Sequence, residues 1–338
     1  MRRLRRSGVT FEECSRLLLQ HDDYLLLTHK NPDGDTVMSA AALCRALRRK
    51  NKRAYLFPNP QLTAKQRLFV EKLLAPESFR PGFVVAVDIA TEQLFPSGWQ
   101  DWSGRRASEK GAGSTAGKVD LCIDHHPSNS HYSSQELIDA GRSSSGEIVQ
   151  QLILQMTGKL TKNEATLLYI ALTTDTGAFQ YANVNEKTYC SAAELMRFGA
   201  EHSSVMVSFF RKTSLSRLRL EGLIYTGLHI HRNGKLVVAT VTREMMERVG
   251  ATEDDCDDLA GLSGRAEGAL MNVTIRETPD GGSKVSVRSA PGISSAAVCA
   301  ALGGGGHELA AGCTVQLPPA AAETLLLDVI DAVCGDSL

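Results

Sequence analysis

Short apolar runs alternate with longer segments of helical periodicity in the first half of the chain. The runs at 24–28, 53–57, 83–87 and 119–123 have the length of strands, whereas helices are predicted at 35–50, 63–74, 145–156 and 162–172. Strands that alternate with helices in this way are typical of a parallel sheet with crossover helices on its faces. The pattern therefore predicts an α/β domain with flanking helices over residues 1–185.

The pattern changes after residue 185. Residues 186–221 show helical periodicity without a strand, which predicts a helical linker. Beyond it, antiparallel-looking strands are predicted at 227–232, 235–242, 269–277 and 283–288, with turns at Asn233-Gly234 and Asp280-Gly281 and a final helix at 319–333. We therefore expect a smaller α/β domain with a mixed sheet over residues 222–338.

The composition is that of a globular chain. Its 338 residues are 43% hydrophobic and 22% charged, with a formal net charge of −1, which excludes the fibrous and wholly disordered classes. No apolar run approaches the roughly 20 residues of a membrane span, so no membrane partner is expected. The basic residues at 1–6 lead into polar residues instead of the apolar stretch of a signal peptide, which favours a cytoplasmic protein.

The eight cysteines also favour a reducing compartment. None belongs to a Cys-x-x-Cys pair, and most lie in apolar stretches. A disulfide framework or a thiolate zinc site needs closer, patterned spacing. Reduced, mostly buried thiols are therefore expected.

Polar residues with metal-binding side chains stand at the ends of the predicted strands. His29, Asp33 and Asp35 follow the first strand, Asp88 follows the third, Asp124, His125 and His126 end the fourth, and Asp175 comes after a later helix. Loops beyond the carboxyl ends of parallel strands converge on one crevice. We therefore expect these side chains to meet there.

Carboxylates gathered so closely cannot all stay ionised, because like charges raise one another's pKa. A pair of divalent cations removes this conflict, and a mixture of carboxylate and imidazole without thiolate favours Mn²⁺, Mg²⁺ or Fe²⁺, with Co²⁺ or Zn²⁺ as alternatives. Taken singly, Asp88 or Asp175 is explained by helix capping or turn chemistry. The combination of several segments favours a two-metal site.

A run of four glycines, Gly303–Gly306, precedes His307 in the second half. Glycines let backbone N–H groups approach an anion closely, and Arg288 has the geometry to pair with the same phosphate. The alternative is a plain flexible loop between a helix and a strand. With His307 and Ala310-Ala311-Gly312 beside the run, we favour a phosphate-binding loop.

These motifs resemble those of the DHH phosphoesterase family. The resemblance rests on His29-x-x-x-Asp33-x-Asp35, Asp88, Asp124-His125-His126 and Asp175, and it covers the whole first domain. Arg288-Ser289 and the segment Gly303, Gly304, Gly305, Gly306, His307 resemble the DHH-associated C-terminal domain. Domain order and length are similar to the bacterial oligoribonuclease (nano-RNase) and PAP phosphatase branch, the NrnA type. The local sequence at 143–147 departs from the family pattern, which leaves the roles of Ser144 and Ser145 open.

The resemblance implies a role for each matched residue. One metal ion would be held by His29, Asp33 and Asp88, and the other by Asp35, Asp88, His125 and Asp175, so that Asp88 bridges the two. His126 would contact the phosphate or protonate the leaving oxygen. Asp124 would orient the neighbouring imidazoles. Ser289, together with Arg288, the glycine run and His307, would bind substrate.

The expected enzyme is a phosphoric ester hydrolase that depends on two divalent ions, with Mn²⁺ favoured. It would degrade short oligoribonucleotides to mononucleotides through attack of a metal-activated water on phosphorus, and act as a phosphatase on 3′-phosphoadenosine 5′-phosphate (pAp). Its partners would be short single-stranded RNA, dinucleotides and pAp. The sequence does not determine the oligomeric state, and a homodimer is left open.

Other functions remain as alternatives. Cyclic-di-AMP or cyclic-di-GMP hydrolysis, or cleavage of linear pApA or pGpG, would use the same metal chemistry. A protein of another class would bind nucleotide or RNA without catalysis. Basic residues are in excess only over residues 1–80, and no extended basic stripe is present, so long duplex nucleic acid is not expected. The role of the Gly/Ser-rich segment 97–118 is open.

Overall fold

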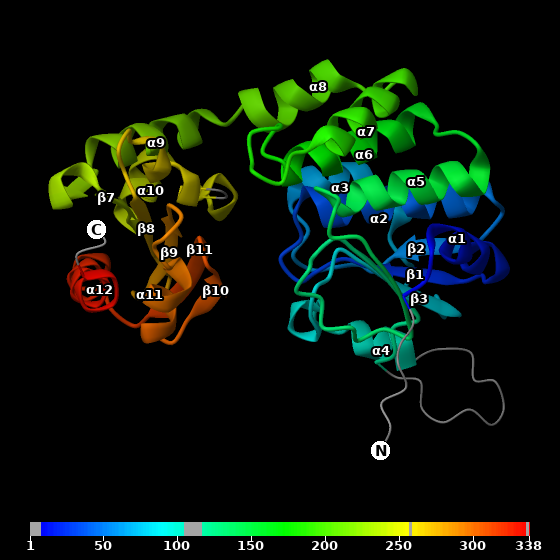
Figure 1. Cartoon of the computed structure of the whole chain (residues 1–338), viewed down its shortest axis with the longest axis horizontal. Helices are drawn as coiled ribbons and strands as arrows, with labels where there is room; N and C mark the ends of the chain where they lie inside the picture. The colour runs from blue at the N-terminus through cyan, green and yellow to red at the C-terminus, as the bar shows by residue number, and fades with distance from the viewer. Residues whose placement is uncertain (1–7, 105–116, 257–258, 336–337) are drawn as a thin grey trace. The chain divides into compact units, whose positions relative to one another are not determined.

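The computed structural model describes residues 8–104, 117–256, 259–335 and 338 (Figure 1). The chain divides into two compact units, Met1–Lys212 and Thr213–Leu338. Helices α7 (Glu186–Arg197) and α8 (His202–Met206), which lie in the expected linker, pack on helix α6 (Lys162–Asp175) of the first unit. The next helix, α9 (Leu215–Thr226), packs in the second unit.

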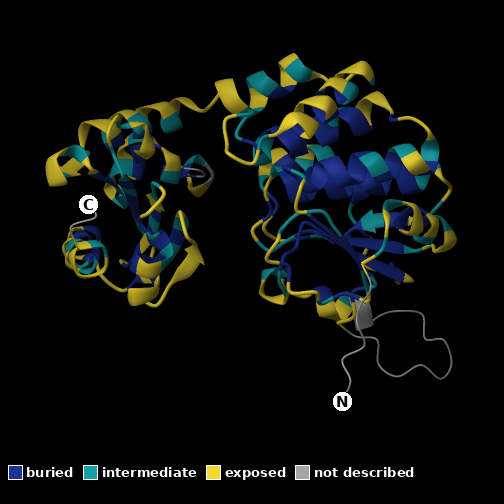
Figure 2. Cartoon of the chain, viewed as in Figure 1, coloured by how far each residue is buried: buried dark blue, intermediate teal, exposed yellow. Residues whose placement is uncertain are grey.

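The first unit is built on a five-stranded sheet in the order β2-β1-β3-β4-β5. Its strands are β1 (Tyr24–Leu27), β2 (Ala54–Leu56), β3 (Phe83–Val87), β4 (Leu121–Asp124) and β5 (Gln135–Ile138). All neighbouring pairs are parallel. Every residue of β1 and β3 is buried, as expected for a parallel sheet that is covered on both faces (Figure 2). The predicted parallel α/β fold is confirmed.

Helices cover both faces of this sheet. Besides α6, α7 and α8, the unit contains α1 (Phe11–Gln20), α2 (Gly34–Arg49), α3 (Ala64–Val70), α4 (Trp99–Gly104), α5 (Ser145–Thr157), and the short helices η1 (Glu71–Leu73), η2 (Glu92–Leu94) and η3 (Val207–Arg211). Helices α2, α5 and α6 pack together on one face, and α4 lies on the other (Figure 1). Tyr24 and Leu26 join the larger hydrophobic cluster, whereas Leu25 and Leu27 join the cluster on the opposite face. The alternation of side chains along β1 therefore holds the two layers to the sheet.

Two features of the first unit differ from the prediction. Strand β5 was not expected, because its sequence QELI is short and lacks an apolar run. Asp175 was expected after the helix at 162–172, whereas it is the last residue of helix α6, which continues three residues beyond the predicted end. Of the segment 97–118, α4 accounts for 99–104, and residues 105–116 lie outside the described part of the chain.

The second unit is built on a six-stranded sheet in the order β10-β11-β9-β8-β7-β6. Its elements are β6 (His229–His231), η4 (Arg232–Gly234), β7 (Leu236–Val241), α10 (Arg243–Val249), η5 (Glu253–Cys256), η6 (Leu259–Gly261), η7 (Ser263–Arg265), β8 (Met271–Glu277), β9 (Ser283–Ser289), α11 (Ser295–Ala301), β10 (Gly305–His307), β11 (Ala310–Val315) and α12 (Pro319–Cys334). One face packs against α11 and α12, and the other against α9 and α10.

The mixed sheet of the second unit is confirmed, but its strands are not all antiparallel. Strands β7 and β8 are parallel, because the chain between them passes through α10 and three short helices and so makes a crossover connection. The other neighbouring pairs are antiparallel. Across the described residues of both units, every helix is too short or too polar to serve as a membrane span.

Candidate metal centre

The predicted metal-binding side chains meet at the carboxyl edge of the first unit's sheet. Three of these residues come after β1, where His29 follows the strand, Asp33 caps α2 and Asp35 lies in the first turn of that helix. Asp88 follows β3. Asp124 ends β4 and is followed by His125 and His126, and Asp175 ends α6. Three groups of their ligand atoms each lie within 4.8 Å of one another. Asp88 belongs to two of these groups, one with His29 and Asp33 and the other with His125 and His126.

The first group consists of His29, Asp33 and Asp88. Nε2 of His29 lies 3.5 Å from Oδ2 of Asp33 and 3.9 Å from Oδ2 of Asp88. Asp33 also accepts a hydrogen bond of 3.1 Å from the backbone N–H of Thr36, which caps helix α2. The capping role that a turn-like Asp suggests is therefore present, and the second carboxylate oxygen still faces the histidine.

The second group consists of Asp35, His125 and Asp175. Nε2 of His125 lies 3.4 Å from Oδ2 of Asp175 and 3.5 Å from Oδ1 of Asp88. The other ring nitrogen, Nδ1, lies 3.2 Å from the carbonyl oxygen of Arg142 and so carries the proton that this carbonyl accepts. Among the described residues, Nε2 of His125 is buried and has no hydrogen-bond partner. A buried acceptor facing two carboxylates fits a metal ligand.

Asp88 lies between the two groups. Its Oδ2 faces His29, and its Oδ1 faces His125 and accepts a hydrogen bond of 3.0 Å from the hydroxyl of Ser145. The residue is 3% exposed and has a φ of 60°, a left-handed conformation that costs a non-glycine residue about 1–3 kcal/mol. Strain of this kind persists where the surrounding structure fixes a functional side chain. The fold thus places one carboxylate against a histidine of each group, and Nδ1 of His126 also lies 3.6 Å from its Oδ1.

The carboxylates of this edge do not ionise independently. Burial, and then the neighbouring Asp35 and Asp33, raise the pKa of Asp88 well above its ordinary value. Burial and Asp33 raise the pKa of Asp35 to about 7, and burial and Asp35 raise the pKa of Asp175 to about 9. Bound cations would stabilise the ionised forms. The donor set of closely spaced carboxylates and imidazoles therefore fits a pair of divalent cations.

Asp124 and His126 form a pair beside these groups. Nδ1 of His126 lies 2.7 Å from Oδ1 of Asp124. The Asp124 side chain is fully buried, and its other oxygen, Oδ2, accepts a 2.6 Å hydrogen bond from the side-chain amide of Asn129. Burial opposes ionisation of Asp124, but its hydrogen bonds with His126 and Asn129 outweigh burial and lower its pKa. Asp124 contacts the ring of His126, whereas it holds His125 only through a 2.8 Å bond from the backbone N–H.

Helix α5 supplies contacts that the sequence interpretation missed. The backbone N–H groups of Ser145 and Gly146 donate to the carboxylate of Asp35 at 2.7 and 3.0 Å. A third bond, of 2.9 Å, comes from the hydroxyl of Ser39 in helix α2 itself. A Cβ at Gly146 would lie 2.9 Å from the Cβ of Ala171, so the helix start requires glycine. No local pattern links Ser145 to Asp35, because the two are separated by 110 residues.

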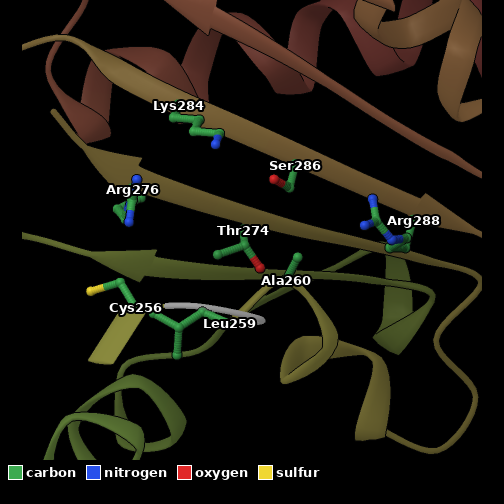
Figure 3. Close-up of a pocket in the computed structure, with 8 residues that line it drawn as sticks. All are labelled: Cys256, Leu259, Ala260, Thr274, Arg276, Lys284, Ser286 and Arg288. Atoms are coloured by element: carbon green, nitrogen blue, oxygen red, sulfur yellow. The ribbon is translucent and has the colours of Figure 1, made fainter. Parts of the chain in front are cut away.

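The predicted substrate-binding residues of the second unit fall into two places. Arg288 on β9 lines a cavity of about 250 Å³ (Figure 3). Its lining residues are Cys256, Leu259, Ala260, Thr274, Arg276, Lys284, Ser286 and Arg288. Arg276 on β8 and Lys284 on β9 were not predicted as substrate-binding residues. Each alternates with core residues along its strand, so both lie on the polar face of the sheet. Three cationic side chains therefore share this cavity.

The glycine run and His307 do not line that cavity. Gly305–His307 forms the exposed edge strand β10, which pairs with β11. A Cβ at Gly304 would lie 2.3 Å from the carbonyl oxygen of Gly312, and one at Gly306 would lie 2.6 Å from that of Ala310, so close strand pairing requires these two glycines. The hydroxyl of Ser289 donates to the carbonyl of Ile293 at 2.6 Å and serves the turn after β9.

The comparisons with known proteins agree with this architecture. The model of the DHH family, N-terminal domain, matches residues 24–172, and the model of the DHHA1 domain matches residues 233–336. The bifunctional oligoribonuclease and PAP phosphatase NrnA of Thermus thermophilus is 31% identical over 293 residues, which cover 86% of this chain and 83% of the relative. The protein of the same name from Bacillus subtilis is 28% identical over 318 residues, which cover 90% and 92%.

A solved structure supports the fold over the same length. The crystal structure of an exopolyphosphatase-related protein from Bacteroides fragilis has a TM-score of 0.79 at 19% identity and covers 95% of this chain and 96% of its own. At that identity the similarity concerns the fold alone. The two domain matches and the relative with 31% identity identify the family. The chain belongs to the DHH family of phosphoesterases and carries a DHHA1 domain as its second unit.

Proposed function

We propose that this protein is a manganese-dependent phosphodiesterase that degrades short oligoribonucleotides to mononucleotides and removes the 3′-phosphate of pAp. The observation that carries the proposal is Asp88, a buried carboxylate whose two oxygens face the candidate ligands His29 and His125. The full-length similarity to proteins named oligoribonuclease and PAP phosphatase supports the substrate class.

We assign one cation to His29, Asp33 and Asp88, and the other to Asp35, Asp88, His125 and Asp175. The absence of thiolate and the excess of carboxylate favour Mn²⁺, with Mg²⁺, Co²⁺ or Fe²⁺ as substitutes. When bound, such a pair activates a water molecule and neutralises charge on the phosphate. The tautomer of His125, with its proton on Nδ1, leaves Nε2 free for a cation.

His126 is the proposed proton donor to the leaving oxygen. Burial opposes its imidazolium form, but the hydrogen bond and charge of Asp124 outweigh burial and raise the pKa of His126. The ring is about one-third exposed, so substrate has access to it. Asp124 fixes Nδ1 and leaves Nε2 as the atom that holds the transferable proton. Asp124 is thus a positioning residue for His126.

The second unit is proposed to bind the phosphates of the substrate. Arg276, Lys284 and Arg288 share one cavity, and a guanidinium pairs with phosphate through two parallel hydrogen bonds. We also include the exposed strand Gly305–His307, with Gly303, Gly304 and Ser289, in the proposed binding surface. This assignment rests on the family motif alone.

A cytoplasmic location is also part of the proposal, because all eight cysteines are free thiols.

A substrate panel with purified protein and Mn²⁺ tests the function. Short 5′-phosphorylated oligoribonucleotides, pAp, cyclic di-AMP and linear pApA are offered side by side, with Asp88→Asn as the control. Mononucleotide release from the short RNAs and phosphate release from pAp, both absent in the variant, are expected. Cleavage of only the dinucleotides would overturn the named substrates and leave the two-metal site. No hydrolysis of any substrate would favour a binding protein.

A further inference from the structure

A further cluster of side chains able to bind a metal lies in the second unit, and none of its members has a role assigned above. His229 and His231 are on the edge strand β6, and Glu323 is in helix α12. Nδ1 of His229 lies 2.9 Å from both carboxylate oxygens of Glu323, and Nε2 of His231 lies 3.1 Å from its Oε1. The three ligand atoms all lie within 4.8 Å of one another.

The alternation of side chains along a strand explains this convergence. Residues two positions apart point to the same face, so His229 and His231 lie together while Ile230 between them is 67% exposed. Glu323 is 8% exposed, so its carboxylate has little contact with water. Two imidazoles therefore face one largely buried anion.

The separations between the three side chains are slightly shorter than the edges of a metal coordination shell. With Zn–N and Zn–O bonds of about 2.0–2.2 Å, two ligands at a tetrahedral angle lie about 3.3–3.6 Å apart. The observed distances of 2.9 and 3.1 Å are those of hydrogen bonds and are shorter than that separation, so a bound cation requires only a small outward shift of the side chains. Without a cation, both rings must direct an N–H at the same carboxylate. With one, neutral imidazoles and the carboxylate serve as ligands together.

We propose that His229, His231 and Glu323 form a zinc site that links the edge strand β6 to helix α12. Two imidazoles and one carboxylate are a ligand set that Zn²⁺ uses, with water in the remaining position. This set is richer in nitrogen than the centre around Asp88, where carboxylates predominate and Mn²⁺ is favoured. The preference for Zn²⁺ is therefore expected to be stronger at this site than at the Asp88 centre.

The location gives the site a structural role. Strand β6 has three residues and, within the part of the chain that the structure describes, pairs with β7 alone at the end of the sheet. A short edge strand has few backbone hydrogen bonds to hold it. A cation bound to both β6 and α12 fastens this strand to the core helix, and it stabilises the native second unit because the unfolded chain lacks the assembled ligands.

Zinc retention by the full chain tests the proposal. The protein is stripped with chelator, incubated with Zn²⁺, dialysed, and its zinc content is measured for the wild type, His231→Gln and Ile230→Thr. Because the Asp88 centre also takes up Zn²⁺, the informative quantity is the difference between variants. We expect His231→Gln to retain one Zn²⁺ fewer per chain, and Ile230→Thr, which alters the same strand without removing a ligand, to retain the wild-type amount.

Further variants separate loss of a ligand from loss of the fold. His229→Gln changes the more exposed imidazole and is expected to lose the same ion, with circular dichroism unchanged. Glu323→Gln keeps a hydrogen-bond acceptor but removes the charge, and Zn²⁺ affinity should fall by at least about 10-fold, since even outer-sphere partners change affinity by that much. Equal zinc retention by the wild type and both histidine variants would overturn the site. Loss of the ion in Ile230→Thr as well would assign the effect to the strand and also overturn it.

Discussion

The hydroxyl of Ser145 donates a hydrogen bond of 3.0 Å to Oδ1 of Asp88, while the backbone N–H of the same residue donates to Asp35 at 2.7 Å. One residue at the start of helix α5 thus fixes the shared carboxylate and a ligand of the second proposed cation. Partners that orient metal ligands contribute to affinity and rate almost as directly as the ligands do. Ser145 is therefore a positioning residue of the proposed centre.

Replacing Ser145 by alanine tests this relationship. Ser145→Ala removes the bond to Asp88 but keeps the backbone N–H on Asp35, so hydrolysis and Mn²⁺ affinity should fall by about 10- to 100-fold with the fold retained. Titration of activity against Mn²⁺ measures both effects. Ser191→Ala is the matched control, because this buried hydroxyl donates to Glu147 and touches no proposed ligand. Equal activity of the two variants would show that Ser145 does not position Asp88.

Removal of the shared carboxylate has a larger effect. Asp88→Asn keeps the size of the side chain but replaces an anion between the two ligand groups by a neutral amide. Retained Mn²⁺ should drop for both positions, and turnover should fall by more than about 100-fold, beyond the range for outer-sphere partners. Metal analysis and hydrolysis of a short oligoribonucleotide measure these losses, and circular dichroism checks the fold. Near-normal turnover would refute the two-metal centre.

The proton-donor role of His126 predicts a different pattern. His126→Ala should keep its metal content and lower the turnover number by about 10²–10⁴-fold, the usual range for general acid catalysis. A diester with a good leaving group needs no proton and should be affected much less. Comparison of the two substrates therefore separates proton donation from binding. Loss of metal in this variant would instead make His126 a ligand.

The raised carboxyl pKa values predict the stability of the metal-free protein. Folding raises the pKa of Asp35 to about 7 and that of Asp175 to about 9, so the native state binds more protons than the unfolded state, whose Asp pKa is about 3.9. The free energy of unfolding should fall as the pH rises from about 4 to about 9.

Urea unfolding in the presence of chelator measures this pH dependence. Asp175→Asn removes one of the responsible groups and should flatten the decline, and Mn²⁺ should oppose it by stabilising the ionised carboxylates. A wild-type stability that is constant or rises over this pH range, with chelator present, would contradict the expected charge conflict.

The cationic cavity of the second unit predicts a defect in substrate binding. Arg288→Ala should raise KM by about 10- to 100-fold for substrates with a terminal phosphate, the value of one or two charge-assisted hydrogen bonds. Simple diesters should be affected less. Arg288→Lys keeps the charge and should recover part of the loss, because lysine lacks the planar donor pair. A uniform effect on all substrates would argue against phosphate recognition by Arg288.

The sequence alone predicts much of the fold and the convergence of the candidate metal-ligating residues. Apolar runs at the positions of β1 and β3 identify buried parallel strands, because only such strands are apolar on both faces. The rule that parallel strands end at one edge then brings His29, Asp88 and His125 together without coordinates. These inferences succeed because hydrophobic periodicity and strand ends are local properties of the chain.

Tertiary structure decides what depends on residues far apart in the sequence. The contacts of Ser145 with Asp35, the grouping of Arg276 with Arg288, and the convergence of His231 on Glu323 each join separate elements. The parallel pairing of β7 with β8 was also missed, because a crossover and a hairpin can connect similar apolar runs. Sequence periodicity shows which face of an element is buried, but not which distant residue it meets, since that is set by packing of the whole core.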